Sequence, residues 1–214
     1  GDIEITGNSA NHLSGIRVTA GGGTAITSLI NNGTIKAQTV TGINAHAIRI
    51  DDPGSITNLT NNNLIIGGIA NFSFGGITAL NNSKGGSSPL LFDGELPSNY
   101  SIIINDSTHY GKLSINPGYS LPAFGSMNFD IFPGAIITAN KYNSVLSGLL
   151  STDISSLIGH YGGLSWELSE TTAGSGIWDL LFPDFVSGPS ASDTQSSLTR
   201  LAPRLRGSFN SVSA

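Results

Sequence analysis

The side chains best suited to acid–base or metal chemistry are four histidines and one pair of adjacent aspartates. The histidines are His12, His46, His109 and His160. None lies in a spacing typical of zinc sites, such as His-Glu-x-x-His. We expect each of them to be a surface or turn residue and not a metal ligand.

Asp51 and Asp52, with Arg49 close before them, form the densest group of charges in the repeat region. Paired carboxylates can act as general acid and base when their pKa values separate. Adjacent residues of a strand point to opposite faces, however, and Asp52, Pro53 and Gly54 form a common turn sequence. We therefore expect a turn here and no active site.

Other catalytic motifs are incomplete. Gly21, Gly22 and Gly23 are not followed by the Lys-Ser/Thr pair of a phosphate loop, and residues 85–88 read as an ordinary loop. No Gly-x-Ser-x-Gly elbow occurs in its usual context. The sequence has no cysteine, which excludes disulfides and thiolate metal sites. We expect no catalytic, cofactor-binding or metal residues, no cofactor, and no enzymatic activity.

The composition excludes further classes of protein. Charged residues make up 11% of the chain, against about 25% in ordinary soluble domains. Hydrophobic residues make up 38%, which excludes a disordered chain. The net charge is −5, and no basic patch typical of nucleic-acid binding occurs before residue 200. No apolar run approaches the roughly 18 residues of a membrane helix. Abundant Asn, Ser, Thr, Gly and Ile favour many short strands joined by turns.

A repeat occupies the first half of the chain. Residues 26–35 match residues 56–65, and residues 77–82 are a shorter third copy. Similar strands at 15–18 and 47–50 precede the first two copies. Asn-Asn-Gly also marks ordinary hairpin turns, but hairpins alone would not repeat both flanking strands. We expect the units to stack around a shared Ile/Leu/Val interior, with asparagines at equivalent corners bonded to one another along the axis.

The repeat ends at about residue 87, and different strands are expected beyond it. Short apolar runs predict strands at 101–104 and 135–138, with weaker indications at 113–115 and 128–132. Residues 142–150 and 153–158 are ambiguous, and a helical turn is possible after Asp153.

A hairpin is predicted from residue 164 to residue 182. Leu164, Trp166 and Leu168 share one face of its first strand. Residues 174–176 form the turn, and Trp178, Leu180 and Phe182 share one face of the second strand. A stack of repeats needs a terminal cap. We expect this aromatic hairpin to supply it, with Trp166 and Trp178 at the core of the cap.

The last part of the chain changes character. Residues 186–192 resemble a linker, and Ser192 or Asp193 could begin a helix. Apolar residues then recur at helical spacing, at Leu198, Leu201, Ala202, Leu205, Phe209 and Val212. Arg200, Arg204 and Arg206 give this tail a basic face, while Pro203 would kink or interrupt the helix. The sequence is compatible both with a helical tail and with a disordered tail.

The order of three segments resembles the C-terminal end of the passenger of bacterial autotransporters, the self-secreting type V class. The Asn-Asn-Gly-Thr-Ile unit at 31–35 is similar to the family's passenger repeats. Residues 101–182, with Tyr-Gly-Lys-Leu at 110–113 and the tryptophan hairpin, resemble the junction segment called the autochaperone. Residues 193–203 resemble the linker helix that enters the translocating barrel.

The resemblance implies an all-β fold, a right-handed parallel β-helix (a solenoid) with an aromatic C-terminal β cap and a short helical or disordered tail. Residues 1–100 would be the terminal rungs of the passenger. Residues 101–185 would be the cap, and 186–214 the linker and the start of the helix leading to the barrel.

The resemblance also implies a partner and a location. The partner is the protein's own C-terminal outer-membrane β-barrel, which is absent from this sequence. The location is the bacterial cell surface, with the passenger tethered to the outer membrane or released from it.

Gly1 to Ile5 read like the inside of a strand, so we expect the sequence to be part of a longer chain. The Asn-Asn pair at which some family members cut themselves has no match at Phe209, Asn210 and Ser211, so autocleavage is not carried over.

Three functions follow as alternatives. The favoured one is a passenger stalk whose cap nucleates folding and supports self-secretion while presenting an upstream effector or adhesin region. The second is an adhesin or self-association module that binds a host protein, a glycan or sister passengers. The third, a polysaccharide-active enzyme, is the least favoured.

Overall fold

The computed structural model describes residues 1–7, 13–19, 25–39, 45–85, 88–115 and 125–186. The described residues contain 17 strands and one short 3-10 helix, η1 (Ser151–Asp153). All of these elements lie in one compact unit, Gly1–Asp184. The predicted all-β class with parallel sheets is confirmed. His12, the glycines at 21–23 and the predicted tail helix lie outside the described residues.

The largest sheet has nine strands, and six of them run parallel in the order β2, β5, β8, β10, β12 and β14. Their bounds are β2 (Leu13–Val18), β5 (Ala45–Asp51), β8 (Ile69–Phe72), β10 (Leu90–Gly94), β12 (Leu113–Ile115) and β14 (Lys141–Ser147). Three antiparallel strands continue the sheet past β14. They are β17 (Ile177–Leu181), β16 (Leu164–Glu170) and β15 (Ile158–Tyr161).

Two smaller sheets are parallel throughout. The five-stranded sheet consists of β3 (Ala25–Asn31), β6 (Ser55–Asn61), β9 (Ile77–Asn82), β11 (Asn99–Ile102) and β13 (Asn128–Ile131). The three-stranded sheet consists of β1 (Ile3–Gly7), β4 (Thr34–Thr39) and β7 (Leu64–Ile66).

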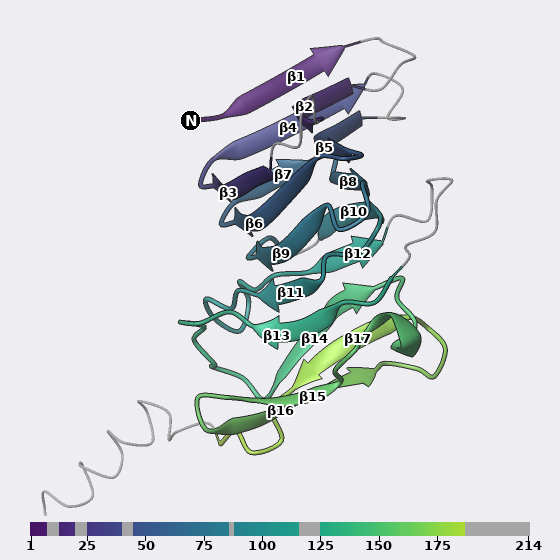
Figure 1. Ribbon diagram of the computed structural model, residues 1–214. Coiled ribbons are helices and arrows are strands. Elements are labelled where there is room, and N and C mark those ends of the chain that lie inside the picture. Colours follow the sequence, from purple (N-terminus) through teal and green to yellow (C-terminus); the bar gives the residue numbers. More distant parts are fainter. Residues whose placement is uncertain (8–12, 20–24, 40–44, 86–87, 116–124, 187–214) are drawn as a thin grey trace, which may run out of the picture. The chain divides into compact units, whose positions relative to one another are not determined.

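The chain visits the sheets in rotation. From β2 to β7 it passes from the nine-stranded to the five-stranded to the three-stranded sheet, and each round lies directly on the previous one. From β8 to β14 it alternates between the two larger sheets, and β15 to β17 all lie in the nine-stranded sheet. Within the unit Gly1–Asp184, Figure 1 shows this stack with β1 at one end and β15 to β17 at the other. We call these the N-terminal and C-terminal ends of the stack.

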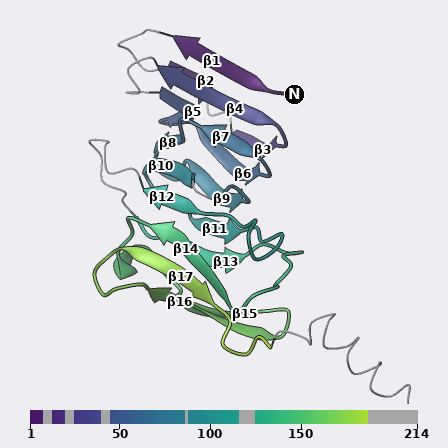
Figure 2. The same cartoon turned by 180° about the vertical axis from the view of Figure 1, so that it is seen from behind.

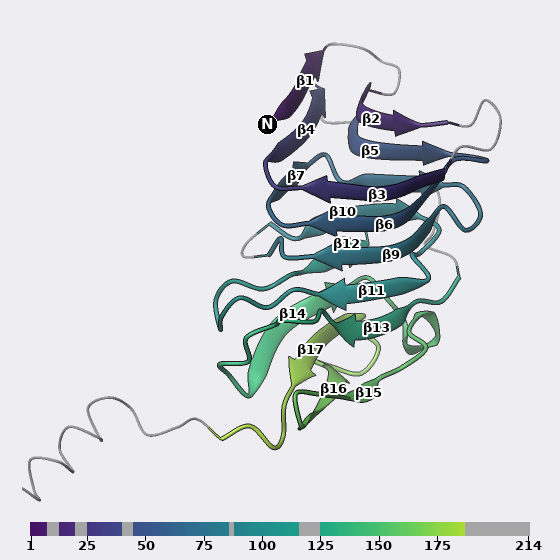
Figure 3. The same cartoon turned by 60° about the vertical axis from the view of Figure 1, so that its left-hand side comes forward.

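Rotated views separate the two large sheets. Figure 2 shows β8, β10, β12 and β14 in succession along one side, with β17 beyond them. Figure 3 shows β3, β6, β9, β11 and β13 crossing another face in the same order. The interior of the stack lies between these faces.

Parallel pairing places like residues of successive rounds in columns. One column in the five-stranded sheet is Leu29, Leu59, Leu80, Tyr100 and Phe129. One column in the nine-stranded sheet is Ile16, Ile48, Ile69, Phe92 and Ile115. The middle members of both columns are fully buried. Burying one such aliphatic side chain contributes about 1.5–3 kcal/mol, so each added round extends a continuous core.

A ladder of buried asparagines runs beside these columns. The Asn31 amide donates to the Asn61 side-chain oxygen at 2.8 Å, and Asn61 donates in the same way to Asn82 at 2.9 Å. Asn82 donates to the Tyr100 hydroxyl at 3.4 Å. The predicted repeat register and the bonds between stacked asparagines are both confirmed. Because each inner amide meets the next, these polar groups are buried without being left unsatisfied.

The strands beyond the repeat match the predictions in part. Strands near 101–104, 113–115 and 128–132 are confirmed as β11, β12 and β13. The helical turn lies before residue 154, as η1, and not after Asp153. Parallel pairing also extends beyond residue 100, through β14.

The strand predicted at residues 135–138 is wrong, because this segment forms no strand. The apolar run does not mark a buried strand, since Ile136 is 58% exposed. The Thr138 backbone N–H donates to the Tyr142 hydroxyl at 2.9 Å, so a side chain satisfies a group that a neighbouring strand would otherwise pair.

Candidate functional site

The C-terminal end of the stack is closed by aromatic side chains. Tyr100 lies above Phe129, with ring centroids 6.0 Å apart, and Phe129 meets Trp166 edge-on at 5.4 Å. In a second group Tyr142 contacts Tyr110 at 5.1 Å and Phe182 at 5.9 Å, both edge-on. Such pairs contribute about 0.5–1.5 kcal/mol beyond their burial. The interior is therefore aliphatic toward the N-terminal end and aromatic at this end.

The hairpin of β16 and β17, here called the closing hairpin, positions both tryptophans. Leu168 pairs with Leu180 in antiparallel register, and Trp166 and Trp178 are each 4% exposed. The predicted hairpin with inward-facing tryptophans is confirmed. Trp178 lies opposite Leu146 and so ends a column that contains Leu90, Leu113 and Leu146. The Trp178 indole N–H donates to the Leu149 carbonyl oxygen at 2.9 Å.

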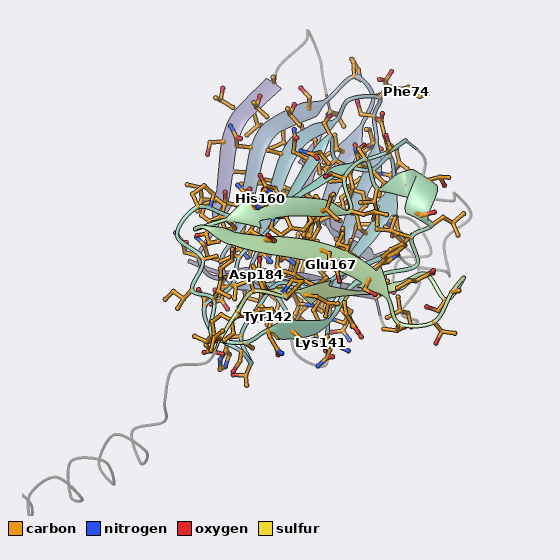
Figure 4. All side chains as sticks on the ribbon, turned by 90° about the horizontal axis from the view of Figure 1, so that it is seen from below. Phe74, Lys141, Tyr142, His160, Glu167 and Asp184 are labelled. Atoms are coloured by element: carbon orange, nitrogen blue, oxygen red, sulfur yellow. The ribbon has the colours of Figure 1, made fainter. Side chains whose placement is uncertain are left out.

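Trp166 is positioned by close packing of its ring and not by a hydrogen bond to a described residue. Its ring packs against Gly159 of β15, where an added Cβ would lie 2.4 Å from the Trp166 Cζ2 atom. Its indole N–H has no hydrogen-bond partner among the described residues. Figure 4 looks at this end of the stack and shows β15 and β16 lying across it, with His160 and Glu167 labelled on them.

Asp179 fixes an irregularity where the parallel part meets the closing hairpin. The pairing of β14 with β17 shifts register between Tyr142 and Leu146, and Ser144 has a φ of 51°. The buried Asp179 carboxylate accepts the Ser144 backbone N–H at 2.7 Å and pairs with the Lys141 ammonium at 2.8 Å. This register shift is a β-bulge. It marks the point at which parallel pairing of the strands changes to the antiparallel pairing of the closing hairpin.

The opposite end of the stack presents strand edges. Within the described residues, β1, β2 and β3 are each the edge of their sheet. Core side chains are less buried near these strands. Ile26 and Leu29 of β3 are only half-buried, while their partners Ile56 and Leu59 in β6 are fully buried. Edge strands present unpaired N–H and C=O groups that can pair with another strand.

The aspartate pair does not form an acid–base pair. Asp51 accepts a hydrogen bond from Arg17 at 2.7 Å and another from Arg49 at 2.8 Å. Burial alone would raise the pKa of the Asp51 carboxyl, but the two guanidinium groups outweigh it and lower the pKa below its ordinary value. Within the described part of the chain, Asp52 accepts only a long contact of 3.5 Å from the Ser73 hydroxyl. Asp51 therefore acts as the centre of an ion-pair group.

The three described histidines lie in separate environments. The prediction of a surface position is wrong for His46, which is fully buried in β5 with its Nε2 atom 3.5 Å from an Asp93 carboxylate oxygen. Its ring is buried because it packs edge-on to Phe72, with centroids 6.0 Å apart. His109 lies in a turn and His160 on β15, and both are exposed as predicted. Among the described residues no group of three or more His, Cys, Asp or Glu side chains could hold a metal ion.

One cleft, lined by polar side chains together with Leu64 and Tyr110, was not anticipated from the sequence. It lies at the corner of the stack, where residues 62–64, 83–85 and 105–110 meet, and has a volume of about 380 Å³. Its residues are far apart in the chain, and only their repeated position after successive strands could have indicated that they meet.

No helix within the described part of the chain is long and apolar enough to cross a membrane. Comparison of the chain with models of known protein families, with curated proteins and with solved structures finds no match.

Proposed function

We propose that the chain is the C-terminal part of an autotransporter passenger, folded as a right-handed parallel β-helix, whose C-terminal end nucleates folding during self-secretion. The rotation of strands β2 to β7 among the three sheets, with parallel pairing between successive rounds, supports the β-helix. Crossovers between parallel strands of one sheet are right-handed in about 98% of cases, which supports the handedness.

The observation that carries the proposal is the difference between the two ends of the stack. The closing hairpin covers the core at the C-terminal end with buried tryptophans, while β1, β2 and β3 leave three parallel edges open at the other end. A stack built this way grows in one direction only, because new strands can be added at the open edges but not beneath the hairpin.

This asymmetry suits a chain that emerges at a cell surface with its C-terminal part leading. The closing hairpin and β14 would fold first and offer an edge to the next strand. Each arriving round would pair its backbone with that edge and bury apolar surface worth roughly 25 cal/mol per Å². Folding outside the membrane would then favour outward movement of the polypeptide chain without ATP.

The partner in this proposal is the protein's own outer-membrane translocator barrel, and the location is the bacterial cell surface. Residues 186–214 would link the stack to that barrel. The residues proposed to act are those of the closed end, above all Trp166 and Trp178.

The test fuses the chain to an autotransporter barrel and measures surface display with an N-terminal epitope and external protease. Trp178→Ala removes a buried ring, which typically costs roughly 3–5 kcal/mol, and we expect display to fall several-fold. Ile136→Ala is the control, because Ile136 is 58% exposed. Wild-type display and protease resistance in Trp178→Ala would contradict the proposal.

A second candidate function, binding of a surface ligand, is favoured by one observation. The corner cleft is lined by a lysine, Lys84, that makes no ion pair within the described residues.

A further inference from the structure

The corner cleft, defined by its polar lining residues, is built from three successive turns of the stack. These residues are Asn62, Asn63, Ser83, Lys84, Asn105, Thr108 and His109. They comprise three amides, two hydroxyls, one ammonium and one imidazole, and no described carboxylate lines the cleft. Its volume of about 380 Å³ is more than ten times the roughly 30 Å³ that one water molecule occupies, so it has room for an organic ligand.

Two lysines occur at the cleft, although the protein as a whole is acidic, and the nearby Asp106 carboxylate is paired with His109. Four of the described basic side chains, namely Arg17, Lys36, Arg49 and Lys141, form ion pairs with carboxylates. Lys84 and Lys112 are in none of the described ion pairs. Lys84 lines the cleft, and the Lys112 ammonium lies 5.1 Å from the ring centroid of Tyr110, which also lines it. The two lysines that form no ion pair with another described residue thus occur at the same place.

The Lys84 ammonium is partly removed from water. Burial lowers the pKa of Lys84, and its one described partner is the Pro89 carbonyl oxygen at 3.0 Å, at a neighbouring hollow that Lys84 lines as well as the cleft. An ammonium carries three N–H donors, so donors remain for a ligand. An anion placed there would form charge-assisted hydrogen bonds and offset the cost of burying the charge.

The opposite wall of the cleft is preorganised by Asp106. Its carboxylate accepts hydrogen bonds from the Thr108 backbone at 2.6 Å, the Thr108 hydroxyl at 2.7 Å and the His109 backbone at 2.7 Å. It also meets the His109 Nδ1 atom at 2.8 Å. These contacts fix the loop and engage Nδ1, which leaves Nε2 as the ring nitrogen for a ligand. A wall held in place before binding reduces the entropy cost of association.

We propose that the corner cleft binds an anionic saccharide, with its carboxylate or sulfate group at Lys84 and its hydroxyl groups on the amides of Asn62, Asn63 and Asn105. Amides both donate and accept hydrogen bonds, as vicinal sugar hydroxyls require. A small inorganic anion would use Lys84 and leave these amides without a role. The site does not depend on the secretory proposal, since its residues lie outside the closing hairpin.

The test measures binding of the whole chain to polygalacturonate, dextran sulfate and uncharged dextran by isothermal titration calorimetry. We expect binding to at least one of the two anionic polymers and none to dextran. Binding to polygalacturonate alone identifies a carboxylate ligand, to dextran sulfate alone a sulfate ester, and to both an anion site of broader selectivity.

Two variants separate a built site from general electrostatic attraction. Lys84→Gln and Lys36→Gln change the net charge equally, but Lys36 lies elsewhere and pairs with Glu4. We expect at least tenfold weaker binding for Lys84→Gln and less than a twofold change for Lys36→Gln. Asn105→Ala should weaken binding severalfold, with an unchanged circular dichroism spectrum. Equal loss in both lysine variants, equal binding of dextran, or no binding of either anionic polymer would overturn the proposal.

Discussion

The side-chain amide of Asn31 donates a buried hydrogen bond of 2.8 Å to the side-chain oxygen of Asn61, 30 residues further along the chain. Asn61 repeats this contact with Asn82 at 2.9 Å. A slip of one residue between rounds would break these bonds and turn every side chain of the strand to the other face. The ladder therefore fixes the register in which the rounds stack.

Asn61→Ala should be clearly destabilising, because it removes the two buried hydrogen bonds that Asn61 makes with Asn31 and Asn82. The Asn31 amide still donates to the Leu64 carbonyl oxygen at 3.2 Å, and the Asn82 side-chain oxygen still accepts the Lys84 backbone N–H at 3.0 Å. A hydrogen bond contributes about 0.5–1.5 kcal/mol, so we expect the free energy of unfolding to fall by about 1–3 kcal/mol in urea titrations. The neighbouring Asn62 makes an equivalent but exposed bond of 2.8 Å to Asn32. Asn62→Ala should cost less than about 0.5 kcal/mol, and equal losses in the two variants would contradict a role for the buried ladder.

The two tryptophans should differ when each is replaced by phenylalanine. Trp178→Phe loses the indole hydrogen bond to Leu149 and leaves that carbonyl buried. Trp166→Phe loses no hydrogen bond, because its indole N–H has no partner among the described residues. We expect Trp178→Phe to be more destabilising by about 1–2 kcal/mol in denaturant unfolding. The reverse order would show that ring volume, and not the bond to Leu149, decides the stability of the closing hairpin.

The sequence predicts the stacked repeat because the stack places like residues on like residues. Ile26, Ile56 and Ile77 are equivalent in the sequence and lie in one column. The closing hairpin is predictable for a similar reason, since strict alternation brings Trp166 and Trp178 to one face.

The remaining pairings depend on contacts that have no local signal. Leu113 lies beside Leu146, but the chain between them carries no repeat. The residues of the corner cleft meet only because corners are stacked, and nothing in the sequence distinguishes Lys84 from a solvated lysine. His46 has no sequence feature that indicates its burial beside Phe72 and Asp93.

Gly159→Ala should disturb the closing hairpin by overpacking. The new Cβ would lie 2.4 Å from the Trp166 ring, and overpacking typically costs about 1–3 kcal/mol. We expect a lower melting temperature and a changed near-ultraviolet circular dichroism signal from tryptophan. Gly7→Ala is the control, since its Cβ would meet Leu13 at an ordinary 3.7 Å. An unchanged tryptophan signal in Gly159→Ala would contradict the close packing of this ring.

Asp51→Asn should change stability in a pH-dependent manner. The pKa of Asp51 in the folded protein is lowered from 3.8 by its two arginine partners. Its contribution is therefore present above about pH 4 and is lost as the pH falls through the folded-state pKa. We expect the variant to be less stable by roughly 0.2–1 kcal/mol at pH 7, with the difference shrinking below pH 4.

Asp52→Asn is the control for the Asp51 prediction, because the one hydrogen bond of the Asp52 side chain among the described residues is a long one, 3.5 Å from the Ser73 hydroxyl. Urea titrations at pH 7 and at pH 3 compare both variants with the wild type. A loss of stability in Asp51→Asn that is the same at both pH values would show that the arginine contacts do not act through the carboxylate charge.

The central claim is that the stack folds from its aromatic C-terminal end. Pulse-labelled hydrogen exchange during refolding tests it most directly, by comparing β14 and β17 with β5 and β6, which are also paired on both sides. The account predicts that amides of β14 and β17 gain protection first and those of β5 and β6 later. Simultaneous protection of all four strands, or earlier protection of β5 and β6, would contradict it.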